Sequence, residues 1–304
     1  MIRRPLASIA LIALCAIASL TPANAETGTY GVSVESGRRE AADGSRVDYV
    51  LYVPQANPEL PQPPWPAVVL THGFERDFSR HVLNAIYLAE RGVIVLTPDM
   101  TSLSGTSASQ LQNVSLTADH LLWLLHRSSD PKDLLFGLVD SKRLGLIGHS
   151  AGGAVSVEAA VDLQSKGVSI AALCLLDTVP WPRTIAAAKN LKPLALMSAR
   201  SEPSRCNANG AVIGLLAQVP FEIYNLKIRS ATHCDPESPT DIACMLLCGG
   251  GSARASATYT EVIYQFLRQA LSLQVVEPHE ETLHQALVRL SDEQRLEITS
   301  APPF

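Results

Sequence analysis

Charged residues of either sign are scarce in this 304-residue sequence. Only 17% of the residues are charged, and 24 Lys and Arg against 29 Asp and Glu leave a formal charge of −5. Nucleic-acid-binding domains generally present a basic surface, so this balance argues against a nucleic-acid partner. A content of 47% hydrophobic residues also argues against a disordered chain. We therefore expect a globular protein with a mildly acidic surface.

Long apolar runs are missing after the N-terminal segment. A membrane-spanning helix needs about 20 consecutive apolar residues, and the only comparable run covers residues 6–20. Two arginines precede this run, and Ala23-Asn24-Ala25 follows it, which is typical of a secretory signal peptide. The sequence predicts a signal peptide over residues 1–25, export to the periplasm or the exterior, and no transmembrane span after cleavage.

Cysteines are few, and most of them lie in one region. Cys174 falls in an apolar run, where we expect a free, buried thiol. An exported chain meets an oxidising compartment, so the clustered cysteines predict two disulfides, whose pairing the sequence leaves open. Zinc is the alternative, because His233 adjoins this cluster, but the spacing matches no common zinc site. The disulfide candidates are Cys206, Cys234, Cys244 and Cys248.

Short apolar runs alternate with segments of helical periodicity along most of the chain. This alternation is typical of a mostly parallel α/β sheet flanked by helices. Continuous apolar runs predict strands that are buried on both faces. The predicted strands cover residues 47–53, 67–70, 93–96, 144–147, 170–176, 194–197 and 221–228, and the predicted helices cover 79–91, 116–125, 151–164 and 259–271.

Nothing in the sequence divides the mature chain, residues 26–304, into two domains. The proline-rich segment 54–66 lies between two predicted strands, so we interpret it as a surface connection. Near the C-terminus, Leu283, Leu287 and Leu290 share one helical face. They predict a peripheral helix over about 278–298, docked on a single domain.

The clearest chemical motif is Gly148-His149-Ser150-Ala151-Gly152, a G-x-S-x-G pattern. It follows one predicted strand and precedes a predicted helix, which is the context of a nucleophile elbow. The flanking glycines remove side chains that would collide on such a sharp turn. The helix N-terminus favours developing negative charge beside Ser150. We predict that Ser150 is a nucleophile; the alternative is an ordinary turn with a capping serine.

A second motif, His72-Gly73-Phe74, ends another buried strand. In enzymes with a nucleophile elbow, the oxyanion hole combines the N–H after the nucleophile with an N–H from this kind of loop. We therefore expect the backbone N–H groups of Phe74 and Ala151 to form it. His72 adjoins Gly73, and we expect it to orient the loop by hydrogen bonding rather than to act as a base.

With these motifs the chain resembles the α/β-hydrolase superfamily over nearly all of its mature sequence. The likeness is closest to the chlorophyllase, platelet-activating-factor acetylhydrolase and polyester-hydrolase-like branches, through residues 72–74, 82–84 and 92–98. The resemblance implies an α/β-hydrolase fold with no lid domain. It also implies a Ser-His-Asp mechanism on carboxylic esters without a cofactor or metal.

The base and the acid of such a triad follow later strands in the order Ser, acid, His. His233 comes after the last predicted strand and is our expected base. Asp177 ends the strand after the nucleophile's helix, where a partly desolvated carboxylate needs a partner. Glu202, one strand later, is the alternative acid, and Asp235 is a third. Related branches use both of the first two positions, and we favour Asp177.

The expected substrate is a small-molecule or lipid-like ester bound in an open cleft. Only about 15 residues follow Asp177 before the next predicted strand, which leaves little room for a lid. Phe74 and Trp181 are possible apolar walls of the cleft, although each is equally consistent with a core anchor. The alternatives are an amide or peptide hydrolase or an acyltransferase with the same triad, or a catalytically silent binding protein of this fold.

Overall fold

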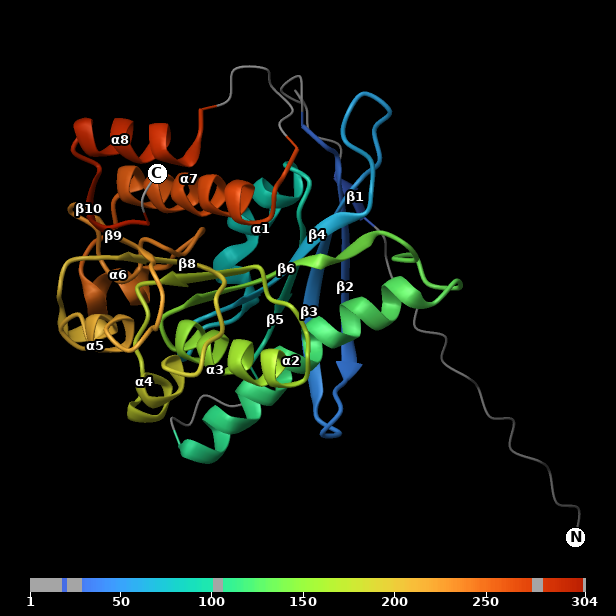
Figure 1. Cartoon of the computed structure of the whole chain (residues 1–304), viewed down its shortest axis with the longest axis horizontal. Coiled ribbons are helices and arrows are strands. Elements are labelled where there is room, and N and C mark those ends of the chain that lie inside the picture. The colour runs from blue at the N-terminus through green and yellow to red at the C-terminus, as the bar shows by residue number, and fades with distance from the viewer. Residues whose placement is uncertain (1–17, 21–28, 101–105, 275–280, 303–304) are drawn as a thin grey trace, which may run out of the picture.

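A computed structural model describes residues 18–20, 29–100, 106–274 and 281–302. Within them the chain builds one sheet in the order β1-β2-β3-β5-β4-β6-β7-β8-β9-β10 (Figure 1). The strands are β1 (Ala18–Leu20), β2 (Val32–Glu40), β3 (Arg46–Pro54), β4 (Trp65–Thr71), β5 (Ile94–Pro98), β6 (Val139–His149), β7 (Ala172–Leu176), β8 (Ala195–Arg200), β9 (Tyr224–Ile228) and β10 (Leu296–Ser300).

The middle of the sheet is parallel, from β5 through β4, β6, β7 and β8 to β9. The outer pairs β1·β2, β2·β3, β3·β5 and β9·β10 are antiparallel. Parallel neighbours require crossover connections, and the α-helices between these strands supply them. The predicted class, a mostly parallel α/β sheet, is confirmed.

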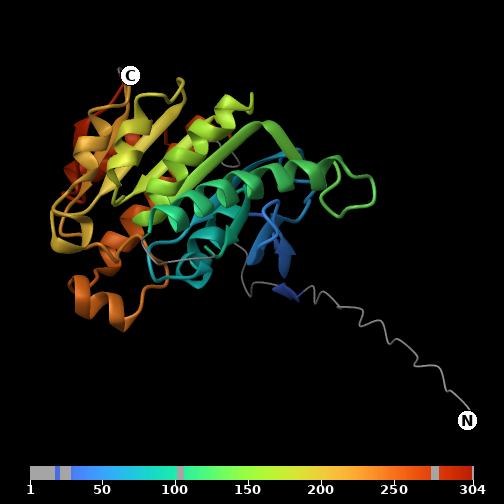
Figure 2. The ribbon, with the colours of Figure 1, turned by 90° about the horizontal axis from the view of Figure 1, so that it is seen from below.

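Helices cover both faces of the sheet (Figures 1 and 2). They are α1 (Val82–Ala89), α2 (Ser107–Ser129), α3 (Ala151–Ser165), α4 (Pro182–Ala188), α5 (Val212–Leu216), α6 (Ile242–Cys248), α7 (Ala253–Ala270) and α8 (Leu283–Asp292), with short 3₁₀ turns η1 (Phe78–His81) and η2 (Arg205–Asn207). One apolar core joins α1, α7 and α8 to one sheet face, and a second joins α2, α3, α4 and α5 to the other.

Alternate residues of the central strands feed these two cores. In β4, Val68 and Leu70 lie in the core with α7, while Ala67 and Val69 lie in the core with α3. All four are at most 1% exposed. Burial on both faces explains why the central strands are continuous apolar runs in the sequence. Because β4, β6, β7 and β8 are neighbours and run parallel, their carboxyl ends lie side by side, and the candidate site is built there.

The C-terminal segment differs from its prediction. The expected helix over about 278–298 is shorter, because α8 covers only Leu283–Asp292, and residues 275–280 lie outside the described residues. The three leucines of α8 do pack into the core, as the periodicity predicts. After α8 the chain forms β10 and adds an antiparallel edge strand to β9. Leu296 and Ile298 alternate with Glu297, the period of two that is typical of a strand.

The predicted signal peptide, residues 1–25, lies outside the described residues except for Ala18–Leu20, which pair with β2. Its function as a signal stays a prediction. Among the described residues, none of the helices combines the length and the apolar character that crossing a membrane requires.

Candidate active site

Ser150 lies on a strained turn between β6 and α3. Its backbone adopts φ 55° and ψ −120°, a conformation that side-chain-bearing residues rarely take. A Cβ on Gly148 would lie 2.3 Å from the carbonyl oxygen of Gly152, and a Cβ on Gly152 would lie 2.4 Å from the carbonyl oxygen of His72. Only glycine fits at both positions. The motif therefore forms the sharp strand-to-helix turn that its sequence context predicts.

Three of the predicted site residues meet at this turn in a chain of hydrogen bonds. The Oγ of Ser150 lies 2.9 Å from Nε2 of His233. On the other side of the ring, Nδ1 of His233 lies 2.6 Å from Oδ2 of Asp177. All three residues are buried, at 7%, 7% and 1% exposure. The arrangement places an imidazole within hydrogen-bonding distance of the hydroxyl and a carboxylate against the imidazole, which is the geometry that general-base activation of a serine requires.

The Asp177 carboxylate is held by three donors besides His233. The backbone N–H and the Oγ of Ser201 each donate to it at 2.8 Å, and the side-chain amide of Asn207 lies 3.3 Å from Oδ2. Burial by itself raises the pKa of Asp177. The hydrogen bond and charge of His233, together with the bonds from Ser201, outweigh that effect and bring the pKa below its ordinary value. Asp177 is therefore ionised at neutral pH.

The loop that carries His233 is fixed from two directions. His149, the residue before Ser150, donates from Nε2 to the backbone carbonyl of His233 at 2.9 Å. The next residue, Cys234, is bonded to Cys244 of α6. Burial and the nearby charge of His233 lower the pKa of His149 to about 3, so its ring is neutral. A neutral ring that donates from Nε2 keeps a lone pair on Nδ1.

The two other candidate acids point away from His233. Glu202 is 47% exposed and pairs with Lys227 at 2.8 Å on the surface. Asp235 is buried, but its Oδ2 accepts from the N–H of Thr232 at 2.6 Å and its Oδ1 accepts from the N–H of Ser252. These bonds shape the loop after β9 and the start of α7. Of the three candidates, the structure brings only Asp177 to the ring of His233.

The loop of Phe74 packs directly against Ser150. A Cβ on Gly73 would lie 3.1 Å from Cβ of Ser150. Nδ1 of His72 donates to the carbonyl of Gly73 at 2.8 Å, and its Nε2 accepts from the N–H of Met100 at 2.9 Å. Because a trans peptide is planar, fixing the Gly73 carbonyl also fixes the N–H of Phe74, which points the opposite way. These contacts agree with the orienting role predicted for His72.

The other proposed N–H donor belongs to Ala151. Ala151 begins α3, where the first N–H groups have no acceptor within the helix.

A buried ion pair lies behind this loop. Arg76 contacts both carboxylate oxygens of Glu237, at 2.7 and 2.6 Å, and Glu237 is 2% exposed. His81 lies in the same region, with its ring 5.8 Å from that of His149. Its two nitrogens have no hydrogen-bond partner within the part of the chain that the structure describes. Burial lowers the pKa of His81 to about 3.

Ser150 and His233 open into a cavity of about 350 Å³. Phe74, which is 46% exposed, lines it, and contact of this side chain with a substrate stays a prediction. Trp181 is not among the described residues that line it; this side chain packs against the core beside α4. The core-anchor alternative therefore holds for Trp181. The remaining lining residues are Gly73, Glu75, Arg76, His149, Cys206, Glu237, Ala243, Cys244, Leu247 and Cys248.

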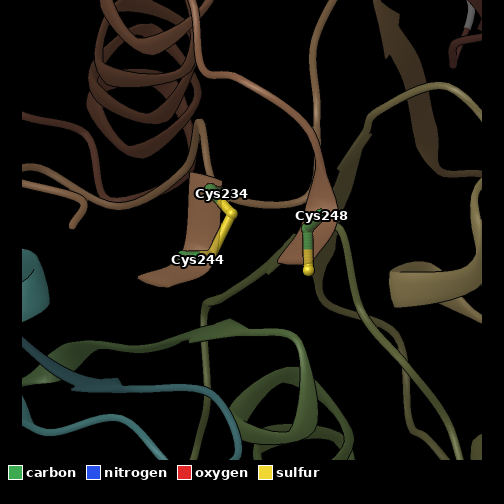
Figure 3. Close-up of side chains that lie close together, drawn as sticks. All are labelled: Cys234, Cys244 and Cys248. Carbon is green, nitrogen blue, oxygen red and sulfur yellow. A yellow bond between two sulfur atoms is a disulfide. The ribbon is translucent and has the colours of Figure 1, made fainter. Parts of the chain in front are cut away.

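Two disulfides form the side of this cavity. Cys206 is bonded to Cys248 and Cys234 to Cys244, while Cys174 is free and buried. The prediction of two disulfides and one free thiol is confirmed, and the structure supplies the pairing. The sulfur atoms of Cys234, Cys244 and Cys248 lie within 4.8 Å of one another (Figure 3). Zinc binding requires thiolates, and these sulfur atoms are held in disulfide bonds.

Ser201, Asn207 and His149 are site residues that the sequence analysis did not identify. Ser201 and Asn207 hold the carboxylate, and His149 holds the main chain of His233. A weak signal exists for two of them, since Ser201 follows a predicted strand and Asn207 adjoins a disulfide candidate. For His149 the only signal is its place in the G-x-S-x-G motif, and the two x positions of that motif accept many residue types.

Comparison with known families agrees with this geometry. The model described as the alpha/beta hydrolase family matches residues 68–275, more than half of the chain and all of the site described above. No curated protein matches the chain. The family match indicates a hydrolase that acts on a small molecule, and the narrower resemblance to chlorophyllase-like branches stays a prediction. The chain belongs to the alpha/beta hydrolase family.

Proposed function

We propose that this protein hydrolyses carboxylic esters with Ser150 as nucleophile, His233 as general base and Asp177 as the acid that orients the base. One observation carries the proposal: the unbroken hydrogen-bond chain from Ser150 through His233 to Asp177, at a strained turn that opens into a cavity. Ordinary packing does not require this arrangement, whereas acyl transfer requires each part of it.

In the first half of the reaction, His233 takes the proton of Ser150 through Nε2 as Oγ attacks the ester carbonyl. The ionised Asp177 stabilises the positive charge that develops on the ring. The carbonyl oxygen becomes an oxyanion, for which the N–H groups of Phe74 and Ala151 are the proposed donors. The tetrahedral intermediate then collapses, and His233 delivers its proton to the departing alcohol.

In the second half, water repeats these steps on the acyl-enzyme. His233 accepts a proton from the water, which attacks the acyl carbon and forms a second tetrahedral intermediate. When this collapses, the proton returns to Oγ of Ser150 and the carboxylic acid leaves. These reaction steps use only protein groups and water.

We further propose that the enzyme works after export. The N-terminal segment has the pattern of a signal peptide, and two disulfides are typical of a chain that folds in an oxidising compartment. A cavity of about 350 Å³ that Phe74 and Leu247 line supports a small-molecule or lipid-like ester as substrate.

A fluorophosphonate probe and a soluble ester test this proposal together. The wild-type protein should be labelled by the probe and should hydrolyse p-nitrophenyl butyrate. Ser150→Ala should lose labelling and at least about 10⁴-fold of the rate constant, because no nucleophile remains. The matched control is Ser165→Ala, at the other end of α3, where the serine bonds only to its own helix. Labelling without ester turnover, or preference for the p-nitroanilide over the ester, would contradict an esterase.

A further inference from the structure

Helix α6 presents an apolar surface to solvent. Its sequence, IACMLLC, contains no charged or hydroxyl side chain. Ile242 is 70% exposed, and Leu246 and Leu247 are each 81% exposed, the two highest values among the exposed large hydrophobic residues of the described chain. Figure 2 shows α6, in orange, projecting from one side of the body. Contiguous exposed apolar side chains of this kind mark an interaction surface.

Covalent and ionic contacts hold α6 in this position. Cys244 is bonded to Cys234, and Cys248, the last residue of α6, is bonded to Cys206 of η2. Asp241 caps the helix by accepting from the N–H of Cys244 at 2.9 Å. The helix therefore cannot turn over to bury its leucines without breaking a disulfide. Its exposed face is a fixed part of the folded surface.

The exposed face continues into the cavity of the candidate active site. Leu247 and Ala243 belong to α6 and line the cavity, and Phe74 lines it from the opposite loop. Phe74 is itself 46% exposed. An apolar path therefore runs from the outer surface of α6, past Leu247 and Phe74, to Ser150.

We propose that α6 inserts its apolar face into the surface of a lipid aggregate and delivers lipid esters from that surface to the cavity. The proposal rests on the proposed ester hydrolysis for the identity of the scissile group. We assign lipid acyl chains as the occupant of this surface. A lipid aggregate can cover the exposed side chains of α6 and also supply ester molecules to the adjoining cavity. Because α6 has only seven residues and a membrane-crossing helix needs about 20, α6 would lie in the surface of the lipid phase and not cross it.

The size of the surface argues against a second protein as the occupant. Even three fully exposed large aromatic side chains would offer only about 750 Å², and the three side chains here are smaller aliphatic ones that are 70–81% exposed. A stable protein interface takes about 800 Å² from each partner. A lipid surface has no such minimum, because each inserted side chain gains from leaving water separately.

The charges at the base of α6 favour an uncharged lipid surface. Arg76 and Arg80 both lie near Asp241, at 3.1 and 3.3 Å, and Arg76 also pairs with Glu237. These arginines are thus neutralised within the protein, and the chain as a whole is acidic. Binding should accordingly depend on apolar contact and persist at high salt.

The test measures binding separately from catalysis. Ser150→Ala protein is sedimented with phosphatidylcholine vesicles, at low salt and at roughly 1 M salt, where charge attraction is screened. We expect binding under both conditions and at least a tenfold weaker partition for the same protein carrying Ile242→Ser and Leu246→Ser. The matched control is Leu134→Ser, because Leu134 is 73% exposed but lies outside α6 and the cavity lining. This control should bind as Ser150→Ala does.

A second readout uses the active enzyme. Introducing Ile242→Ser and Leu246→Ser should lower the rate on an emulsified long-chain ester at least tenfold relative to the rate on soluble p-nitrophenyl butyrate. No vesicle binding by the parent protein, or equal binding by the α6 variant, would overturn the proposal. So would a dimer in solution that the α6 substitutions dissociate, since the occupant would then be a second copy. Failure of ester hydrolysis is separate, because it appears as lost turnover while vesicle binding is measured without catalysis.

Discussion

The side-chain amide of Asn207 lies 3.3 Å from Oδ2 of Asp177, the oxygen that accepts from His233. The same amide lies 3.0 Å from Oγ of Ser201 and 2.8 Å from the carbonyl of Glu202. Its own oxygen accepts from the N–H of Ser204 at 2.8 Å. Asn207 is 2% exposed and adjoins the Cys206–Cys248 disulfide. It therefore links the carboxylate to the turn that the disulfide anchors.

Asn207→Ala should lower kcat on a soluble ester by roughly ten to a hundredfold, or about 1.4–2.7 kcal/mol of transition-state stabilisation. The reason is that Asp177 loses a donor that fixes its orientation toward His233. KM should stay within about twofold, because Asn207 does not line the cavity. Rates are normalised to active sites counted with the fluorophosphonate probe.

Asn190→Ala is the control for Asn207→Ala, since Asn190 lies on the surface after α4. It should leave kcat unchanged. A variant Asn207→Ala that loses thermal stability but keeps the wild-type kcat per labelled site would show that Asn207 is only structural.

Asp177→Asn and Glu202→Gln distinguish the two acids. Asp177→Asn should lower kcat/KM by several orders of magnitude, because an amide neither stabilises the imidazolium nor holds the same ring tautomer. Glu202→Gln should cost less than about tenfold, since Glu202 pairs with Lys227 at the surface. Both are measured on one soluble ester. The opposite ranking would assign the acid to the loop after β8.

The two disulfides should stabilise the protein unequally. The Cys206–Cys248 bridge closes a loop over a sequence separation of 42, and the Cys234–Cys244 bridge one over 10. Chain entropy gives about 4 and about 3 kcal/mol for loops of these lengths. Urea unfolding should therefore show the larger loss for Cys206→Ser with Cys248→Ser than for Cys234→Ser with Cys244→Ser.

Thiol counting provides an independent check of the bridges. Denatured, unreduced protein without residues 1–25 should alkylate at one cysteine, Cys174, and reduced protein at all five. Intact mass gives the number directly. Five reactive thiols before reduction would contradict both disulfides.

Acidification should destabilise the fold through His81. Its folded pKa is lowered from 6.5 to about 3 by burial, with His149, His72, Arg76 and the carboxylate of Glu237 nearby. The unfolded chain therefore binds a proton below pH 6.5 that the folded chain does not bind until about pH 3. Above pH 6.5 the titration of this histidine does not lower the free energy of unfolding. Below pH 6.5 it lowers the free energy of unfolding by about 1.4 kcal/mol per pH unit.

His81→Phe removes this proton uptake and should make the decline shallower by about 2 kcal/mol between pH 6.5 and 5. Urea unfolding at several pH values measures the slope. His126→Gln, on the exposed side of α2, is the control and should leave it as in the wild type. Equal slopes for His81→Phe and the wild type would contradict the assignment to His81.

Much of the fold and part of the candidate site follow from the sequence by itself. Continuous apolar runs predict the doubly buried strands, because each strand touches a core on both faces. The glycines around Ser150 predict the sharp turn, since any Cβ there would collide with backbone. The cysteine cluster predicts two disulfides. These features are local, so a short stretch of residues is enough to specify them.

Other features were decided only by tertiary structure. Asp177 and Glu202 both follow strands, and only the packing of the loops turns one carboxylate to His233 and the other to Lys227. The pairing of the cysteines, the role of Asn207 and the edge strand β10 likewise depend on which distant segments meet. A hydrogen bond or disulfide acts over a few ångströms, and residues that are tens of positions apart come that close only when the whole sheet has formed.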